Sequence, residues 1–269
     1  MFLNHRRPAF CLLTNVMFIF CLVFFSSCNR TQNDNQKTKN ELVVGMLPAD
    51  APFMSVNEQG AYEGFDVDVA AGIAQHLGRT LVIKEMAVPE LCMALDRGRI
   101  DMLMCGFSIT QERLQRFAMV HYQGVGVNTF PLVFWRIVPQ GIASMQDLRG
   151  KNATVGVLAG TLQENFARQF DFINVKLLNG YADIVLELQY GKITAALFDE
   201  AFEGFARKFS DLLAVNVPLG TFESKGHGIA IKKNNTELTN LVEQAVQQLK
   251  NNGTIGQLEQ KWQFAGEAS

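Results

Sequence analysis

Short runs of apolar residues alternate with segments of helical periodicity from Glu41 to the end of the chain. The apolar runs predict strands over residues 42–46, 81–85, 100–105, 154–158, 173–178, 193–198 and 228–232. Between the strands, side chains such as Val69 and Ile73 recur on one face of a helix. The last helix is long, with Thr236 as its cap and Gly253 as its end. This alternation predicts an α/β fold.

The order of the elements occurs twice along the chain. Gly98-Arg99-Ile100-Asp101 enters one strand and Gly191-Lys192-Ile193-Thr194 enters another, each after an amphipathic helix. We therefore predict a clamshell of two lobes, each a mixed sheet flanked by helices, with two hinge crossings. The first lobe is expected to contain residues 41–125 and 220–269, and the second residues 126–219. The candidate crossings are Gly124-Val125-Gly126 and Val215-Asn216-Val217, where small backbone changes allow closure.

The N-terminal segment has a different pattern. His5-Arg6-Arg7 precedes the run Ala9 to Phe25, in which 15 of 17 residues are apolar, and Ser26-Ser27 follows it. This order predicts a signal peptide over residues 1–27, with a short membrane anchor as the alternative.

Cys28 follows the small residues directly and resembles the cysteine of a bacterial lipobox, although Phe25 departs from the usual leucine. We expect Cys28 to be lipidated and to anchor the chain to a membrane, with ordinary secretion as the alternative. Asn29 to Asn40 contains no apolar side chain, so residues 28–40 are expected to form a flexible tether.

Composition excludes several classes of protein. Hydrophobic residues make up 48% of the 269 positions, which excludes wholesale disorder and provides for one large or two mid-sized cores. The chain has 24 Lys and Arg against 26 Asp and Glu. Removal of residues 1–27 takes away two arginines and no acid, so the mature chain has a net charge of about −4. A chain without a basic excess is not expected to bind nucleic acid.

Few side chains indicate metal or redox chemistry. Only Cys92 and Cys105 remain as cysteines after the signal peptide and Cys28, and the sequence leaves open whether they pair. The histidines at positions 5, 76, 121 and 227 lack the spacing of metal ligands. We expect neither a metal site nor a cofactor.

Ligands of open α/β sheets bind outside the carboxyl ends of the strands, where four segments of this chain lie: residues 47–53, 106–113, 159–163 and 199–200. A helix is predicted over residues 111–117 with Thr110 as its cap. Arg113 falls in the first turn of this helix, where the helix dipole disfavours a cation. An anion there would meet the helix amides, the Ser108 hydroxyl and a bidentate guanidinium. A solvated arginine paired with a carboxylate is the alternative.

Two residues of the second lobe complete this pattern. Thr161 forms a capping box with Glu164, and a purely structural cap is the alternative to a ligand contact. Asp199 ends a buried strand, where a carboxylate requires a cation or hydrogen-bond donors. A carboxylate-binding corner in one lobe and an ammonium-binding corner in the other would hold a zwitterion.

The order and spacing of five motifs make the chain resemble the bacterial solute-binding proteins for amino acids that serve ABC importers. The resemblance extends from Glu41 to about Trp262 and rests on Gly64-Phe65-Asp66-Val67-Asp68, Gly98-Arg99-Ile100-Asp101, Ser108-Ile109-Thr110-Gln111-Glu112-Arg113, Gly156-Val157-Leu158-Ala159-Gly160-Thr161, and Gly191-Lys192 through Asp199-Glu200. The chain is most similar to the lysine/arginine/ornithine and glutamine receptors.

The resemblance implies a type II periplasmic-binding-protein fold and a free amino acid as ligand. It also implies an ABC transporter permease as partner, a periplasmic location and a monomer. In that family, the position of Arg113 binds the ligand α-carboxylate with help from those of Ser108 and Thr161. The position of Asp199 binds the α-ammonium, and those of Cys105 and Gly106 line the same pocket.

The departures from the family lie where the ligand side chain is expected. Relatives often have an acid at the position of Leu47 and aromatic residues at those of Asp50 and Val88, so the usual aromatic sandwich is missing. Phe107 supplies either one apolar wall or ordinary core. Asp50 either reaches into the cleft to pair with a cationic or amide side chain, or points to solvent. We expect a free polar amino acid as ligand, with arginine or lysine not bound in the relatives' sandwich.

Two other functions stay open at this point. Some relatives are cyclohexadienyl-dehydratase-like enzymes, and such a reaction needs a general acid or base, for which Glu200, Asp50 and Cys105 are the candidates. No histidine is placed to activate Cys105, so no catalytic residue is assigned. The other alternative is an amino-acid sensor that works without a transporter.

Overall fold

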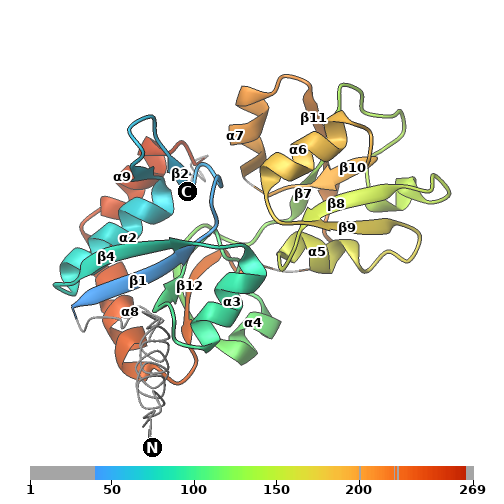
Figure 1. Cartoon of the computed structure of the whole chain (residues 1–269). Coiled ribbons are helices and arrows are strands. Elements are labelled where there is room, and N and C mark those ends of the chain that lie inside the picture. The colour runs from blue at the N-terminus through green and yellow to red at the C-terminus, as the bar shows by residue number, and fades with distance from the viewer. Residues whose placement is uncertain (1–39, 200, 221, 223, 265–269) are drawn as a thin grey trace, which may run out of the picture. The chain divides into compact units, whose positions relative to one another are not determined.

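The computed structural model describes residues 40–264 except residues 200, 221 and 223. Most of its strands form two five-stranded sheets, with helices packed against them (Figure 1). A small hairpin, β2 (Ser55–Val56) with β3 (Tyr62–Glu63), lies outside both sheets. The predicted α/β class and the presence of two mixed sheets are therefore confirmed.

The first sheet has the strand order β4-β1-β5-β12-β6. Its strands are β1 (Glu41–Met46), β4 (Thr80–Glu85), β5 (Met102–Leu103), β6 (Phe117–Gln123) and β12 (His227–Lys232). The first three strands are parallel, whereas β12 runs antiparallel to both β5 and β6. The accompanying helices are α2 (Phe65–His76), α3 (Val88–Asp96), α4 (Gln111–Arg116), α8 (Thr236–Asn251) and α9 (Thr254–Lys261).

The second sheet repeats this plan in the order β9-β8-β10-β7-β11. Its strands are β7 (Thr129–Trp135), β8 (Thr154–Leu158), β9 (Asn174–Leu178), β10 (Ala195–Leu197) and β11 (Leu212–Pro218). Again three parallel strands are followed by one that runs antiparallel to its neighbours on both sides. Its helices are η1 (Met145–Leu148), α5 (Leu162–Ala167), α6 (Tyr181–Gln189) and α7 (Ala201–Lys208).

The repeated motifs have the same structural role in both sheets. The carboxylate of Asp101, just before β5, accepts a hydrogen bond from the Val43 amide of β1 at 2.9 Å. The hydroxyl of Thr194, just before β10, accepts one from the Thr154 amide of β8 at 3.1 Å. In each sheet, the residue just before one parallel strand (β5 or β10) thus binds the backbone of the neighbouring parallel strand (β1 or β8).

The chain passes between the sheets twice, because β6 is followed by β7 and β11 by β12. The predicted crossing Gly124-Val125-Gly126 lies in the first of these connections. The second prediction, Val215-Asn216-Val217, is wrong, since these residues belong to β11 and pair with Leu132, Pro131 and Phe130 of β7. The second passage lies instead between Pro218 and His227. The residue limits predicted for the two lobes stay a prediction.

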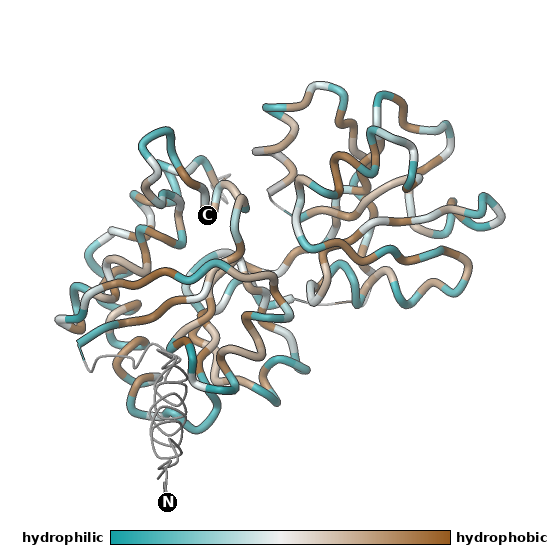
Figure 2. The backbone as a smooth tube through the Cα atoms, viewed as in Figure 1, coloured by the Kyte–Doolittle hydropathy of each residue, from teal (hydrophilic) through white to brown (hydrophobic). Residues whose placement is uncertain are grey.

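Figure 2 shows hydrophobic residues concentrated along the strands and hydrophilic ones in the connecting loops. One apolar core lies at the first sheet, a second lies at the second sheet, and a third includes residues of both sheets, such as Val43 and Val133. In the first, side chains of β1 pack with those of α2 and α8, including the fully buried Ile73 and Val242. Two helix signals differ from the prediction. Asn235, not Thr236, caps α8 by accepting the Leu238 amide at 3.2 Å. The helix that ends before Gly253 is not the last, because α9 follows with Gly253 as its N-cap.

The predicted signal peptide, the lipidated Cys28 and the tether up to residue 39 lie outside the described residues. Within residues 40–264, no described helix is long and apolar enough to cross a membrane.

Candidate functional site

One pocket collects every residue that the sequence indicated for ligand binding. Asp50, Cys105, Gly106, Phe107, Ser108 and Arg113 line it from the first sheet's side, and Thr161 and Asp199 line it from the second. These residues come from four segments of the chain, which follow β1, β5, β8 and β10. The geometry therefore brings together the predicted set, whereas their roles toward a ligand stay a prediction.

Arg113 is held at both ends of its guanidinium group. Its Nη1 donates to the Ser108 carbonyl oxygen at 2.8 Å, and its Nη2 donates to the Gly160 carbonyl oxygen at 2.9 Å. Thr110 caps α4 by accepting the Arg113 amide at 3.2 Å, as its position predicted. The guanidinium has five N–H groups, so these two bonds leave others for a ligand.

The Phe107 ring lies directly under this cation. The Arg113 Cζ atom is 3.6 Å from the ring centroid, which is cation–π geometry. Burial lowers the pKa of Arg113 to about 10, so the guanidinium stays charged at neutral pH. Phe107 is only 3% exposed, and its contact with Arg113 makes it the support of the cation as well as part of the pocket wall.

Thr161 is the cap of α5, as predicted. Its hydroxyl accepts the Glu164 amide at 3.4 Å and donates to the Leu158 carbonyl at 2.7 Å. The Glu164 carboxylate accepts a hydrogen bond from the Gly160 amide at 2.7 Å. In a standard capping box it would accept from the amide of the cap residue itself, Thr161. The structural role of Thr161 is therefore present alongside its place in the pocket.

The two acidic residues lie at different depths. Asp50 is 2% exposed and lines the pocket, so the alternative in which it points to solvent is wrong. Its amide donates to the Met54 carbonyl at 2.8 Å, which folds the loop after β1 back on itself. Asp199 is partly buried and follows β10 by two residues.

The turn after β5 forms the floor of the pocket. Gly106 has φ +55°, and a Cβ atom there would lie 2.7 Å from the Phe53 ring, so this position requires glycine. Its amide donates to the carboxylate of Asp66 at 3.0 Å. Burial raises the pKa of the neighbouring Cys105 thiol well above its ordinary value, which keeps it protonated. Cys92 and Cys105 are both free thiols.

Several further lining residues were not selected from the sequence. Leu47 and Val88 were identified only as departures from the family, while Leu158, Leu162, Gln163 and Tyr181 were not identified as pocket residues. Gln163 lies in the segment 159–163, which was expected near a ligand because it follows a strand. Its side chain is only 5% exposed, unlike that of an ordinary surface glutamine. Tyr181 opens a helix and stacks on Phe198 with centroids 4.9 Å apart, which no local signal indicates.

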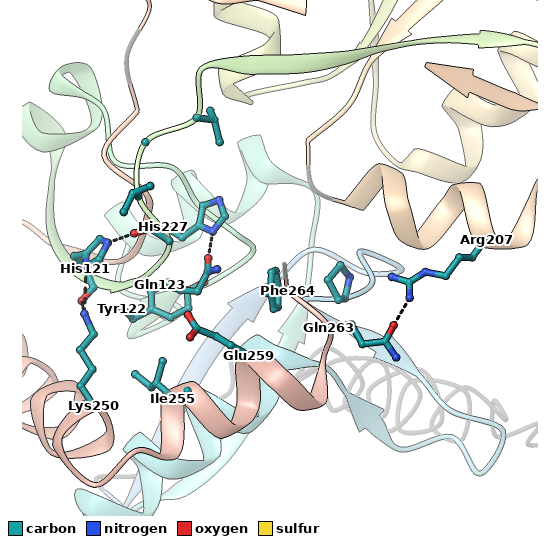
Figure 3. A pocket seen from close by; sticks show the side chains of 16 residues that line it. His121, Tyr122, Gln123, Arg207, His227, Lys250, Ile255, Glu259, Gln263 and Phe264 are labelled. Atoms are coloured by element: carbon teal, nitrogen blue, oxygen red, sulfur yellow. Dashed lines mark hydrogen bonds between the residues drawn. The ribbon is translucent and has the colours of Figure 1, made fainter. Parts of the chain in front are cut away.

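The pocket is narrow in this structure. Its cavity volume is about 20 Å³, enough for about one water molecule. A second cavity of about 590 Å³ lies beside the first crossing, lined by Gly124 to Val127 together with residues of β6, α8 and α9 (Figure 3). None of the predicted binding residues lines it. We place the candidate site in the narrow pocket, because a charged cluster at strand ends is there and the Arg113–Gly160 hydrogen bond accounts for its closure.

The larger cavity has its own polar rim. Arg207 donates a hydrogen bond to the Gln263 side chain across it, and the Lys250 ammonium donates to the His121 carbonyl at 3.2 Å (Figure 3). No group of three or more His, Cys, Asp or Glu side chains that could hold a metal ion occurs within residues 40–264 as described.

Comparison with known proteins gives a consistent result. The model of one family, described as bacterial extracellular solute-binding proteins, family 3, matches residues 42–265. The probable ABC transporter arginine-binding protein ArtJ of Chlamydia trachomatis serovar D is 27% identical over 259 residues, covering 96% of this chain and 97% of that protein.

Solved structures agree. An ancestral arginine-binding protein bound to arginine has a TM-score of 0.75 and 27% identity, covering 84% of this chain and 99% of that one. An ancestral amino-acid-binding protein, a precursor of cyclohexadienyl dehydratase, has a TM-score of 0.72 and 27% identity, with 83% and 95% covered.

Proposed function

Because the chain belongs to family 3 of the bacterial extracellular solute-binding proteins, we propose that it captures a free amino acid outside the cytoplasm and delivers it to an ABC importer. The observation that carries this proposal is the convergence of Arg113 and Asp199 on one pocket. Arg113 comes from α4 beside the first sheet, and Asp199 follows β10 of the second sheet. A cation and a carboxylate from two sheets match the two charges of a zwitterion.

In this proposal Arg113 binds the α-carboxylate. Its guanidinium is fixed by Phe107 and by the Ser108 carbonyl, so little side-chain entropy is lost when a carboxylate arrives. The ligand carboxylate replaces the Gly160 carbonyl oxygen as the acceptor of the Arg113 Nη2 hydrogen bond. The Arg113–Gly160 hydrogen bond, which narrows the pocket in this structure, is then broken. Asp199 receives the α-ammonium, and the Ser108 hydroxyl and Thr161 complete the carboxylate corner.

Opening of the pocket requires a movement between the sheets. A cavity of about 20 Å³ does not admit an amino acid, so the two sides separate before a ligand enters and close again around it. The crossing with Gly124 at φ +69° is the segment that we assign to this movement. Identical X-ray scattering profiles with and without a bound amino acid would contradict closure.

The side-chain half of the pocket favours a polar ligand. Asp50 is buried and lines the pocket together with the apolar Leu47 and Val88, and a buried carboxylate is stabilised by a cation or by hydrogen-bond donors. We propose a ligand whose side chain carries an ammonium, guanidinium or amide group. Relatives named for arginine binding support this class, although the aromatic residues that would sandwich a basic side chain are replaced here by Asp50 and Val88.

The direct experiment is a calorimetric titration of the purified mature chain with each of the common amino acids. We expect at least one polar amino acid to bind, together with a rise in thermal stability that depends on ligand concentration. Asp199→Asn is expected to weaken amino acids and to spare analogues that lack the α-amino group. Absence of binding by every amino acid would contradict the proposal.

We further propose that Cys28 carries a lipid and that the protein is a monomer tethered to a membrane. The support is the order of an apolar run, two small serines and a cysteine in the sequence. Mass spectrometry of the N-terminal peptide from membrane fractions tests this, with Cys28→Ala expected to release the protein. Light scattering during gel filtration tests the monomer.

A second candidate function is an enzyme on the same fold, which the likeness to the precursor of cyclohexadienyl dehydratase keeps in view. Asp50 and Cys105 are in the pocket, whereas Glu200 lies outside the described residues. No histidine is among the residues that line the described pocket, so Cys105 has no imidazole there to activate it. Loss of water from a hydroxylated cyclohexadienyl acid on incubation with the protein would favour this alternative.

A transporter-independent sensor would bind amino acids equally well, and transport assays with the permease distinguish it.

A further inference from the structure

A buried carboxylate lies behind the candidate site and does not line it. Asp66 is the second residue of α2 and is completely buried. Its Oδ2 accepts a hydrogen bond from the Gly106 amide at 3.0 Å, and its Oδ1 accepts one from the Tyr122 hydroxyl at 2.5 Å. One carboxylate thus connects two segments that are distant in sequence, and both have a place in the proposed binding cycle.

The first connection supports the pocket floor. Gly106 has φ +55° and lines the pocket, so the backbone of this turn is presented directly to a ligand. The Phe53 ring packs against the same glycine and prevents the turn from moving toward it. The Gly106 peptide is thus held by a hydrogen bond to Asp66 and by packing against the Phe53 ring.

The second connection leads to the crossing. Tyr122 lies in β6, two residues before Gly124, where the chain leaves the first sheet. Its side chain is completely buried and stacks on Phe65 with centroids 6.0 Å apart. Figure 3 shows Tyr122 next to Gln123 and His121 at the edge of the larger cavity, where the crossing begins.

Burial of a carboxylate is unfavourable unless donors compensate for the lost water, so two donors in good geometry indicate a selected contact. The neighbouring acid on α2, Asp68, shows the contrast. Its carboxylate binds Lys261 at 2.7 Å and the Trp262 indole at 2.8 Å, at the outer face of α9. Asp68 holds helices together, whereas Asp66 reaches the pocket turn.

We propose that Asp66 is a positioning residue that fixes the Gly106 turn for ligand binding and ties it to β6, the strand that enters the first crossing. The proposal rests on the proposed function, since it assigns a purpose to the turn in binding an amino acid. Without Asp66, the Gly106 amide has lost its acceptor and the turn is less ordered. Part of the free energy of ligand binding is then used to order the turn. Affinity then falls for every amino acid, with no change in which amino acid is preferred.

The test uses three variants and one control. Asp66→Leu removes both acceptors at similar volume. Asp66→Asn keeps an oxygen that accepts from the Gly106 amide and adds an N–H group that can donate to the Tyr122 hydroxyl oxygen. It is therefore the conservative variant, in which both connections are kept. Tyr122→Phe leaves the Gly106 bond and breaks only the tie to β6. Asp68→Leu is the control, with the same change two residues away on the same helix.

The first readout is hydrogen exchange of the Gly106 amide in the ligand-free protein, measured by NMR. We expect it to be at least about tenfold faster in Asp66→Leu, and within about threefold of the wild type in Asp66→Asn and Asp68→Leu. The second readout is affinity, which we expect to fall at least about tenfold in Asp66→Leu and several-fold in Tyr122→Phe, equally for all bound amino acids.

The two readouts separate the two proposals. Unchanged exchange of Gly106 in Asp66→Leu overturns the positioning role whether or not a ligand is known. Faster exchange in a protein that binds no amino acid upholds the positioning role and contradicts the proposed function. Should Asp66→Leu fail to fold, Tyr122→Phe decides, because wild-type affinity in that variant overturns the tie to the crossing strand.

Discussion

Arg113 and Phe107 form a stacked pair in which the guanidinium carbon is 3.6 Å from the ring centroid. The two residues are six positions apart in the chain: Phe107 lies four residues after β5, and Arg113 lies in α4. A guanidinium held over an aromatic face keeps the N–H groups at its edges, which point outward in its own plane, free for hydrogen bonding. The pair therefore provides a preorganised carboxylate receptor.

Replacement of the aromatic face tests this role. Phe107→Leu is expected to weaken binding of every amino acid by roughly 3- to 30-fold, because a desolvated cation–π contact contributes about 0.5–2 kcal/mol. Calorimetry gives the affinity. The control is Phe172→Leu, which removes the ring whose centroid lies 4.2 Å from the Arg149 guanidinium carbon, outside the pocket. Equal losses in both variants would assign the effect to core packing.

The burial of Asp50 leads to a prediction about selectivity. Asp50→Asn is expected to reduce affinity for amino acids with cationic side chains at least about tenfold and to leave neutral ones nearly unchanged, since only a cation gains from the carboxylate charge. Competition of paired neutral and basic amino acids for the same protein measures the difference. A uniform loss across ligands would mean that Asp50 only stabilises its loop.

Two buried groups make opposite contributions to the pH dependence of stability. Burial raises the pKa of Asp66 to about 7, so the native state binds a proton between about pH 4 and 7 that the unfolded chain has released. Stability from this group therefore falls as pH rises through that range. Burial lowers the pKa of His227 to about 4, so between about pH 4 and 6.5 the unfolded chain binds the extra proton and stability rises with pH.

The variants separate these contributions. Relative to the wild type, the free energy of unfolding of Asp66→Asn is expected to rise between pH 4 and 7, and that of His227→Gln to fall between pH 4 and 6.5. Each slope is at most about 1.4 kcal/mol per pH unit, the limit for one proton. Tyr122 and Cys105 interact with the Asp66 charge, but burial raises the pKa of each well above its ordinary value, so neither titrates between pH 4 and 7. Urea unfolding at several pH values provides the measurement, and parallel curves would contradict the assignment.

Cys105 provides a chemical probe of occupancy. Its thiol lines the pocket and its pKa is raised by burial, so alkylation at neutral pH is expected to be slow. A bound amino acid is expected to slow it at least about tenfold further. Cys92 lies on α3 outside the described pocket and serves as the internal control, since its alkylation should not respond to ligand. Mass spectrometry resolves the two sites in one experiment.

The sequence predicts those parts of this fold that local chemistry determines. Thr110 and Thr161 cap their helices where the pattern indicated, because a cap depends on residues within one turn. The two motifs that precede β5 and β10 also predicted a repeated plan. In contrast, the prediction of a crossing at Val215-Asn216-Val217 is wrong, because these residues form part of β11. Its strand character comes from pairing with β7, which is distant in sequence.

The site shows the same division. Arg113 and Asp199 were identified from their places after strands, a local property. The burial of Asp50 was not decided by its flanking prolines, since the fold-back onto Met54 sets its direction. Tyr181 and Gln163 reach the pocket only because α5 and α6 pack beside it. The support of Gly106 by Asp66 joins residues 40 positions apart and has no signature in either segment.

The central claim is that the Arg113 guanidinium binds the α-carboxylate of an amino acid. The most direct measurement is calorimetric affinity of the wild type and Arg113→Ala for one bound amino acid and for its α-carboxamide. Arg116→Ala is the control, because Arg116 lies on the same helix and pairs with Asp96. We predict that Arg113→Ala loses at least about 30-fold in affinity for the amino acid and little for the carboxamide, with Arg116→Ala unchanged. Wild-type affinity in Arg113→Ala would contradict the account.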